Sequence, residues 1–347
     1  MGKFSLIQKN ITSSSIYVFF QHADSPSNPA YIVFDSDLGM WSDPVILTTM
    51  SLHDQENGVY NSDPRAVYWN NKIYLFGRGP DQHVLAMIFD GTTWSDPVTL
   101  GDLSCNAITP IVWNNSLYIF YAGHDIGNGT PLSCSQYDEN LNPNTPDGNA
   151  GGYWVSKNDC TSYPIAPHSV SRNIPAIWSV FNKNGVGYIA QFDGNNLYDG
   201  QGLSQDCNPS FGPSTIPVGD NNQVVAYKGS GANGGLYMLQ LIFTDSAEWY
   251  VQEPPILIDG INISTAPWGI LLDGDGSTTA NFAIFYAETA ENVDVAPRLK
   301  MAIIDCNGTD IDGSGTNDKY TYTLSAIQNI DIPVAPTNCS PFALPIP

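Results

Sequence analysis

Five side chains suited to sugar binding lie near the predicted turns of residues 61–101. A sugar site needs flat aromatic faces that cover C–H patches and forked polar groups that bind neighbouring hydroxyls. This stretch offers one aromatic and four polar side chains, which are Asp63, Arg65, Arg78, Asp81 and Trp94. The open alternative is that both arginines pair with neighbouring carboxylates and so stabilise the fold.

Two tryptophans share one sequence setting, because the WSDPV of residues 41–45 recurs letter for letter at residues 94–98. Each tryptophan falls where an outer strand of its repeat is expected to close. We therefore expect Trp41 and Trp94 to pack as wedges between neighbouring units, with sugar stacking as the second role.

A different set of side chains could carry acid–base chemistry. Histidine transfers protons near neutral pH, and a pair of carboxylates can cleave a glycosidic bond. The candidates in or beside predicted loops are His22, Asp63, His124, His168 and Glu288. If such groups meet in one central funnel, the chain is an enzyme, for example a glycosidase, an isomerase or a cyclase.

One loop crowds oxygen ligands in the way that calcium requires, with Asp310, Asp312 and Asp318 close together in sequence. The loop lacks the full spacing and the terminal glutamate of an EF-hand. Exposed hairpin turns also use Asp, Gly, Asn and Ser. The loop is a candidate calcium site, and no other cofactor is expected.

The elements that would position these side chains recur along the chain. In the clearest copy we expect strands at Arg65–Trp69, Ile73–Arg78 and Val84–Phe89, followed by an edge segment that ends at Leu100. Asp90-Gly91 between apolar runs is a strong hairpin signal, because both turn residues must tolerate positive φ. The third strand of each copy ends before an aspartate, at Asp35, Asp90, Asp138, Asp193, Asp245 and Asp305.

Six copies at a spacing of about 40 to 55 residues are typical of a β-propeller. We therefore predict an all-β, six-bladed β-propeller built of four-stranded antiparallel blades. The repeat covers nearly the whole chain, so residues 1–347 are expected to form a single domain. One second-strand position is mostly aromatic, which indicates packing between blades, and holds Phe20, Gly77, Tyr121, Phe181, Tyr227 and Tyr286.

The tail, Asn338–Pro347, resembles the segments that begin first strands in other copies, SDPRAVY from Ser62 and TAPWGIL from Thr265. We therefore predict that the tail adds a strand to the N-terminal blade and closes the ring. Closure of this kind removes free sheet edges. The alternative is that Phe4–Gln8 fills that place and the tail packs outside.

The repeat resembles the sugar-binding β-propellers of fungi and bacteria, above all in the run from IYLFGRGPD at residues 73–81 to DGTTWSDPVTLG at residues 90–101. This family includes the six-bladed fungal fucose-specific lectins and bacterial lectins whose blades end in a Gly-x-x-Trp-Ser turn. The resemblance implies glycan binding in pockets between adjacent blades, each built from an Arg, a Glu and an aromatic.

The repeated arginine of that pattern is not kept in this chain. Aligned second strands place five different residue types at one position, occupied by Gln21, Arg78, Ala122, Asn182, Lys228 and Ala287. Arg78 alone among them has a guanidinium that could bracket sugar hydroxyls. The loss of repetition fits either drift or one asymmetric site in the central funnel.

The charge of the chain excludes two classes of partner. Lysine and arginine number 12 against 34 aspartates and glutamates, which gives a formal net charge of -22. Such a surface repels nucleic-acid phosphates and anionic lipid headgroups. No apolar run reaches the length of about 18 residues that membrane insertion needs.

The six cysteines have no metal-binding spacing, and Cys134 with Cys160 is the first candidate disulfide. The first residues lack the apolar core of a secretory signal. If Met1 is the natural start, a cytoplasmic location is expected, and otherwise a secreted one.

Together these features favour a carbohydrate-binding lectin without catalysis, which recognises glycans by aromatic stacking and by Arg and Asp hydrogen bonds. The expected partner is a glycan or a small molecule, and the expected state is a monomer or a small homo-oligomer. An enzyme with one active site in the central funnel is the alternative.

Overall fold

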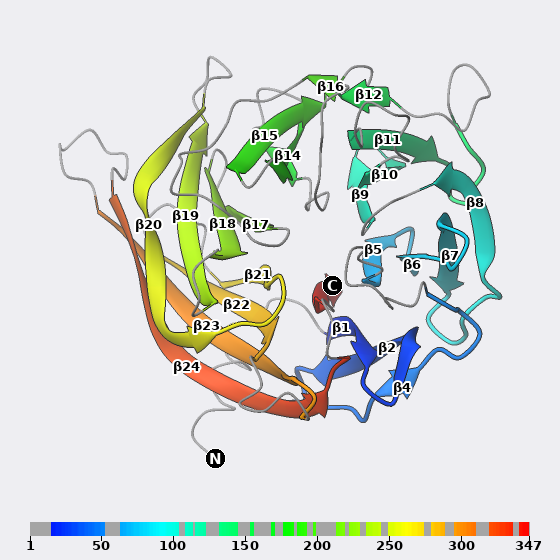
Figure 1. Cartoon of the computed structure of the whole chain (residues 1–347), viewed down its shortest axis with the longest axis horizontal. Coiled ribbons are helices and arrows are strands. Elements are labelled where there is room, and N and C mark those ends of the chain that lie inside the picture. The colour runs from blue at the N-terminus through cyan, green and yellow to red at the C-terminus, as the bar shows by residue number, and fades with distance from the viewer. Residues whose placement is uncertain are drawn as a thin grey trace.

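The computed structural model of the chain is all β, as Figure 1 shows. The structure describes residues 15–52, 63–103, 108–113, 115–122, 132–144, 153–155, 168–170, 176–183, 186–192, 197–198, 213–218, 222–229, 234–243, 249–273, 279–288, 295–309, 319–335 and 340–346. Within these ranges no helix has the length and hydropathy of a membrane span.

The first three blades follow the predicted strand order. The first blade contains β1 (Ser15–His22), β2 (Ser25–Asp35), β3 (Met40–Trp41), β4 (Val45–Ile46) and β25 (Phe342–Ile346). The second contains β5 (Arg65–Trp69), β6 (Lys72–Arg78), β7 (His83–Phe89) and β8 (Val98–Leu103). The third contains β9 (Thr109–Trp113), β10 (Ser116–Ala122), β11 (Leu132–Tyr137) and β12 (Tyr153–Val155).

The first blade has five strands because β4 also pairs with β2, and the other three blades, like the second and third, are four-stranded sheets. The fourth contains β13 (His168–Val170), β14 (Ala176–Lys183), β15 (Val186–Phe192) and β16 (Leu197–Tyr198). The fifth contains β17 (Ser214–Val218), β18 (Asn222–Lys228), β19 (Gly235–Phe243) and β20 (Trp249–Asn262). The sixth contains β21 (Trp268–Asp273), β22 (Thr279–Ala287), β23 (Arg298–Thr309) and β24 (Lys319–Pro333).

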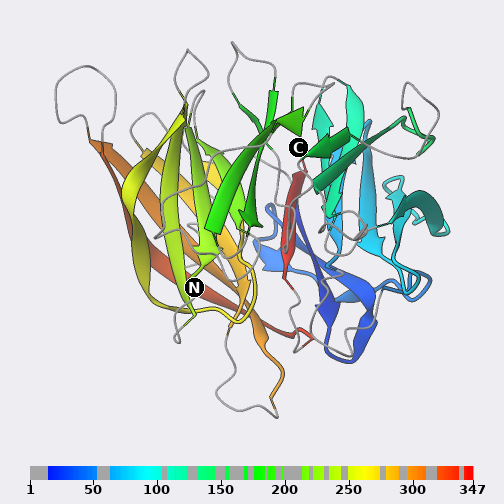
Figure 2. The same cartoon turned by 45° about the horizontal axis from the view of Figure 1, so that its top comes forward.

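The six sheets surround a common centre, and the C-terminus lies near it (Figure 1). The last strand, β25, pairs antiparallel with β1 from Ser15–Ile346 to Phe19–Phe342. Figure 2 shows β25 at the centre of the molecule, where it also contacts β5 and β21 of the two neighbouring blades. The prediction that the tail joins the N-terminal blade is therefore confirmed, and the competing segment Phe4–Gln8 lies outside the described residues.

The aspartate that ends a third strand caps the following turn with its own side chain. In three copies the Oδ1 atom accepts two backbone N–H groups of the turn, which explains why the sequence repeats this residue type. The donors are Asp37 and Leu38 for Asp35, Thr92 and Thr93 for Asp90, and Asn140 and Asn142 for Asp138, at N···O distances of 2.7–3.0 Å.

Because of these turn hydrogen bonds, the charge state of Asp90 affects the stability of the fold. The N–H groups of Thr93 and Thr92 lower the pKa of Asp90, since they stabilise its ionised form. The stabilisation is expected to be complete above the ordinary aspartate pKa of about 3.9 and to be lost as the pH falls through the lowered value. Carboxyl carbon NMR checks this directly, and a titration midpoint for Asp90 at or above the ordinary value would contradict it.

The mostly aromatic second-strand position does pack between blades. Phe20, Tyr121, Tyr227 and Tyr286 are all buried there. Gly77 is the exception because a β-carbon at that position would collide with the Leu52 side chain, which fills the space together with Met50. The loop before the second blade thus replaces the missing ring.

Candidate functional site

Trp41 packs between the first and sixth blades. Its ring centroid lies 5.1 Å from that of Phe34 in its own blade and 6.1 Å from that of Phe285, at a right angle of 86°. The next residue, Ser42, locks the segment to β2, because its Oγ accepts the N–H of Val33 at 3.0 Å. Trp41 is therefore a wedge between two blades, as the sequence predicts.

Trp94 repeats this geometry between the second and first blades. It lies 5.1 Å from Phe89 in its own blade and 6.3 Å from Phe19 of the first blade, at 87°. Ser95 Oγ accepts the N–H of Ile88 at 3.0 Å, as Ser42 does in the first blade. Both indole N–H groups are buried without a hydrogen-bond partner in the described part of the chain, so the tryptophans stabilise the ring by packing.

The junction of the first and second blades differs by a pair of tyrosines from the other junctions whose side chains are described. The Tyr31 ring lies 5.8 Å from that of Tyr17 and 5.9 Å from that of Trp94. Tyr17 also lies 6.5 Å from Phe89, so the four rings contact one another in a closed circuit. All four are half-buried, while Phe19 beneath them is fully buried. We call Tyr17, Tyr31, Phe89 and Trp94 the aromatic cluster.

The positions that Tyr17 and Tyr31 occupy hold buried side chains in the other blades whose side chains are described. The strand register identifies the two equivalent positions in each blade. The first lies two residues before the residue that matches Phe19, and the second pairs directly with that residue on the next strand. Each equivalent is buried, and the pairs are Tyr74 and Ala86, Tyr118 and Cys134, Val224 and Met238, and Ala283 and Met301. Only the first of these described blades therefore has two partly exposed tyrosines at these positions.

Tyr74 shows how the next junction is sealed. Its hydroxyl donates a hydrogen bond to the backbone carbonyl of Glu139 in the third blade at 3.0 Å, and its ring lies in the core. In the aromatic cluster, burial and the neighbouring Tyr31 raise the pKa of Tyr17, so its hydroxyl stays protonated and can donate as well as accept. The cluster thus combines aromatic faces with polar tips.

The predicted ligand residues Asp63 and Arg65 lie instead at the centre of the ring. Arg65 Nη2 donates to Asp63 Oδ2 at 3.3 Å, and Nη1 donates to the carbonyl of Pro341 at 3.4 Å. Its guanidinium also lies over the rings of Trp268 and Phe342, 5.0 and 5.4 Å from their centroids. Burial lowers the pKa of Arg65 and the Asp63 carboxylate opposes this. Arg65 therefore pairs with a neighbouring carboxylate, which is the alternative to sugar binding that the sequence left open.

A short chain of hydrogen bonds connects three blades at this centre. Asp63 Oδ1 accepts the N–H of Ser340 at 2.8 Å, and Ser340 Oγ accepts the N–H of Ala266 at 3.2 Å. Trp268 Nε1 donates to the carbonyl of Ala343 at 3.0 Å. Each residue belongs to the segment that begins a first strand, so these bonds hold β25 in place between its neighbours.

The remaining predicted ligand residues do not form one site with Trp94. Arg78 is 1% exposed and pairs with Val84 at the start of β7, whereas Trp94 pairs with Phe89 at the other end of that strand. Asp81 is exposed in the turn beside Arg78, where its Oδ1 accepts the N–H of His83 at 3.2 Å. The length of β7 separates these polar groups from the aromatic cluster.

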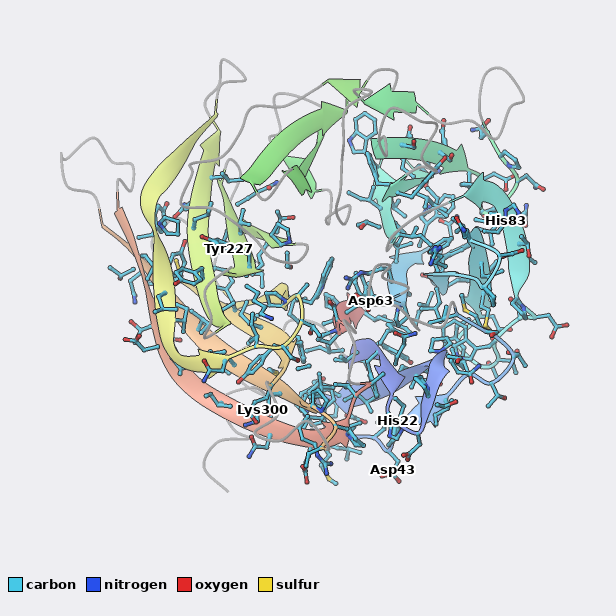
Figure 3. The ribbon with its side chains drawn as sticks, viewed as in Figure 1. His22, Asp43, Asp63, His83, Tyr227 and Lys300 are labelled. Carbon is cyan, nitrogen blue, oxygen red and sulfur yellow. The ribbon has the colours of Figure 1, made fainter. Side chains whose placement is uncertain are left out.

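The residues proposed for acid–base catalysis do not converge where the structure describes them. Figure 3 shows Asp63 near the centre of the ring and both His22 and Lys300 further out. His22 is buried, and its Nδ1 accepts the N–H of Asp24 at 3.2 Å. Glu288 pairs with Lys300 at 2.6 Å. These contacts are structural, and His124 and the side chain of His168 lie outside the described part.

The calcium loop with Asp310, Asp312 and Asp318 also lies outside the described residues. Within the described ranges, no group of three or more His, Cys, Asp or Glu side chains could hold a metal ion. Cys134 is buried in β11, and its predicted partner Cys160 is not among the described residues.

No protein-family profile and no curated protein matches this sequence. Solved structures match along nearly its whole length. A mutant of AofleA from Arthrobotrys oligospora has a TM-score of 0.58 at 12% identity, over 97% of this chain and 91% of that chain. The fucose-specific lectin from Aleuria aurantia has a TM-score of 0.56 at 12% identity, over 92% of each chain.

A mutant of the Aleuria aurantia lectin in complex with α-methyl-L-fucoside is also similar, with a TM-score of 0.52 at 13% identity over 94% of this chain and 96% of that chain. Another structure of this lectin is described as a six-bladed β-propeller. The predicted fold and the resemblance of the repeat to that fold are thereby confirmed. At these identities the comparison establishes architecture alone.

Proposed function

We propose that the protein is a carbohydrate-binding propeller lectin and that the aromatic cluster of Tyr17, Tyr31, Phe89 and Trp94 is its glycan site. The observation that carries the proposal is the pair of partly exposed tyrosines at a blade junction whose described equivalents are buried. The four rings pack on the core beneath them, and their remaining accessible surface is where a ligand would stack.

The geometry of the cluster suits a saccharide. Its ring planes are inclined by 30° between Tyr17 and Tyr31 and by 32° between Phe89 and Trp94, so each pair offers a broad aromatic face. Such a face covers the C–H side of a pyranose, while the tyrosine hydroxyls can bind sugar hydroxyls. The solved Aleuria aurantia complex with a fucoside supports the proposal, since that protein shares the fold.

The test begins with a glycan array that identifies a ligand, with and without a calcium chelator because the chain also carries a candidate calcium loop. Calorimetric titration of that ligand then compares wild type with Tyr31→Ala. We expect affinity to fall roughly tenfold or more, since a central aromatic contact is removed.

The matched control is Tyr237→Ala. Tyr237 is another half-buried tyrosine, stacked on Tyr227 in the fifth blade at 5.6 Å. It lies outside the aromatic cluster, so its loss should leave glycan affinity unchanged. Equal affinity of Tyr31→Ala and wild type for the ligand would overturn the proposed site.

A further inference from the structure

Three aspartates lie on the segments that border the aromatic cluster. Asp35 lies on the same strand face as Tyr31, because residues 31, 33 and 35 alternate along β2, and the ladder pairs it with Ser15. Asp90 lies in the turn that joins Phe89 to Trp94. Asp96 is exposed two residues after Trp94. The site therefore combines aromatic faces with an acidic rim.

Lys72, the lysine in the described part of the second blade, does not neutralise this rim. Lys72 begins β6 directly across from Trp69, and Trp69 belongs to the core between the second and third blades. Lys72 thus shares the blade face that points away from the aromatic cluster. The chain as a whole is also acidic, with 34 acidic against 12 basic residues.

We propose that the aromatic cluster prefers glycans that carry a protonated amine, such as glucosamine oligomers, over neutral and acidic glycans. This inference rests on the proposed function. An ammonium group gains cation–π attraction at the face of a tyrosine or tryptophan and Coulomb attraction from nearby carboxylates. An acidic sugar has no cation–π attraction and is repelled by the carboxylates, whereas a neutral sugar gains from stacking alone.

The turn aspartates provide a way to remove the charge and keep the fold. Asparagine can accept the same turn N–H groups as aspartate, so Asp35→Asn and Asp90→Asn preserve the caps that each residue forms. Asp138→Asn is the matched control, because Asp138 caps the equivalent turn of the third blade. All three variants should stay folded and should lower the unfolding temperature by a similar small amount, because each loses the extra stabilisation that its turn N–H groups give to a charged carboxylate.

The experiment is calorimetric titration at mildly acidic pH with three tetrasaccharides, built from glucosamine, N-acetylglucosamine and glucose. For wild type we expect the glucosamine tetramer to bind roughly fivefold more tightly than the two neutral tetramers of N-acetylglucosamine and glucose. The gain comes from cation–π attraction and from exposed charge pairs. In the double variant Asp35→Asn/Asp90→Asn this preference should disappear while affinity for the neutral tetramers stays the same. Asp138→Asn should behave as wild type.

The outcomes separate this inference from the proposed function. Equal affinity for charged and neutral tetramers, both lost in Tyr31→Ala, overturns the amine preference and leaves the lectin site standing. If the glucosamine tetramer still binds to Tyr31→Ala, the net charge of the protein alone attracts the amine. That result also overturns the proposed preference of the aromatic cluster for amines. If no saccharide binds with a dependence on Tyr31, the glycan site itself is wrong.

Discussion

Replacing Asp63 by alanine should lower the free energy of unfolding by about 3–5 kcal/mol, because it leaves the buried Arg65 guanidinium without its carboxylate. Arg65 is 7% exposed, and its second hydrogen bond, to the carbonyl of Pro341, cannot replace an anion. The same change also leaves the N–H of Ser340 without its acceptor. Urea unfolding of the variant and wild type measures the loss.

Two further variants sharpen this test. Asp63→Asn keeps an oxygen for Ser340 and removes only the charge, so it should destabilise less than alanine. Arg298→Ala breaks an ion pair with Asp331 at 3.6 Å in which both side chains are well exposed, and we expect a loss of at most about 1 kcal/mol. Equal losses for Asp63→Ala and Arg298→Ala would show that the centre of the ring does not depend on the buried pair.

Phe342→Ala is expected to cost about 3–5 kcal/mol for a different reason, which is the loss of a buried ring from the closing strand. Phe342 lies 4.2 Å from Trp268 of the sixth blade between ring centroids and pairs across β25 with Phe19 of β1. A cavity there removes packing from three blades together. Thermal unfolding monitored by tryptophan fluorescence should show a lower and broader transition.

Pro345 provides the control for the closing strand. It pairs with Ile16 in the same ladder but is exposed, so Pro345→Ala should change the stability by about 1 kcal/mol or less. If Phe342→Ala is as stable as Pro345→Ala, β25 does not hold the ring closed.

The fold could be predicted because its signals are local. The aspartate caps and the Trp-Ser pairs each act within a few residues, so their repetition in sequence reports the repetition of blades. Ring closure followed from a likeness between Asn338–Pro347 and the segments that begin other first strands. In the structure, Ser340 and Ala266 of two of these similar segments take part in the hydrogen bonds at the centre of the ring.

The candidate site could be predicted only in part, because it lies between blades. Trp94 was recognised, but Arg78 was grouped with it since both fall in one turn-rich stretch, and β7 in fact separates them. Tyr17 and Tyr31 were missed because each looks like an ordinary strand residue in its own blade. A comparison of second strands two residues before Phe19 would not have singled out Tyr17, because Tyr74 and Tyr118 stand at the matching positions. Tyr31 is the tyrosine that such a comparison distinguishes, since the matching positions in the other described blades hold Ala86, Cys134, Met238 and Met301.

The most direct test of the glycan site is a crystal structure of the protein soaked with the saccharide that it binds most tightly. We expect a sugar ring stacked on the aromatic cluster, with its hydroxyls near the phenol groups of Tyr17 and Tyr31. A saccharide bound instead beside Arg78, or at the central opening near Asp63, with the aromatic cluster empty, would contradict it.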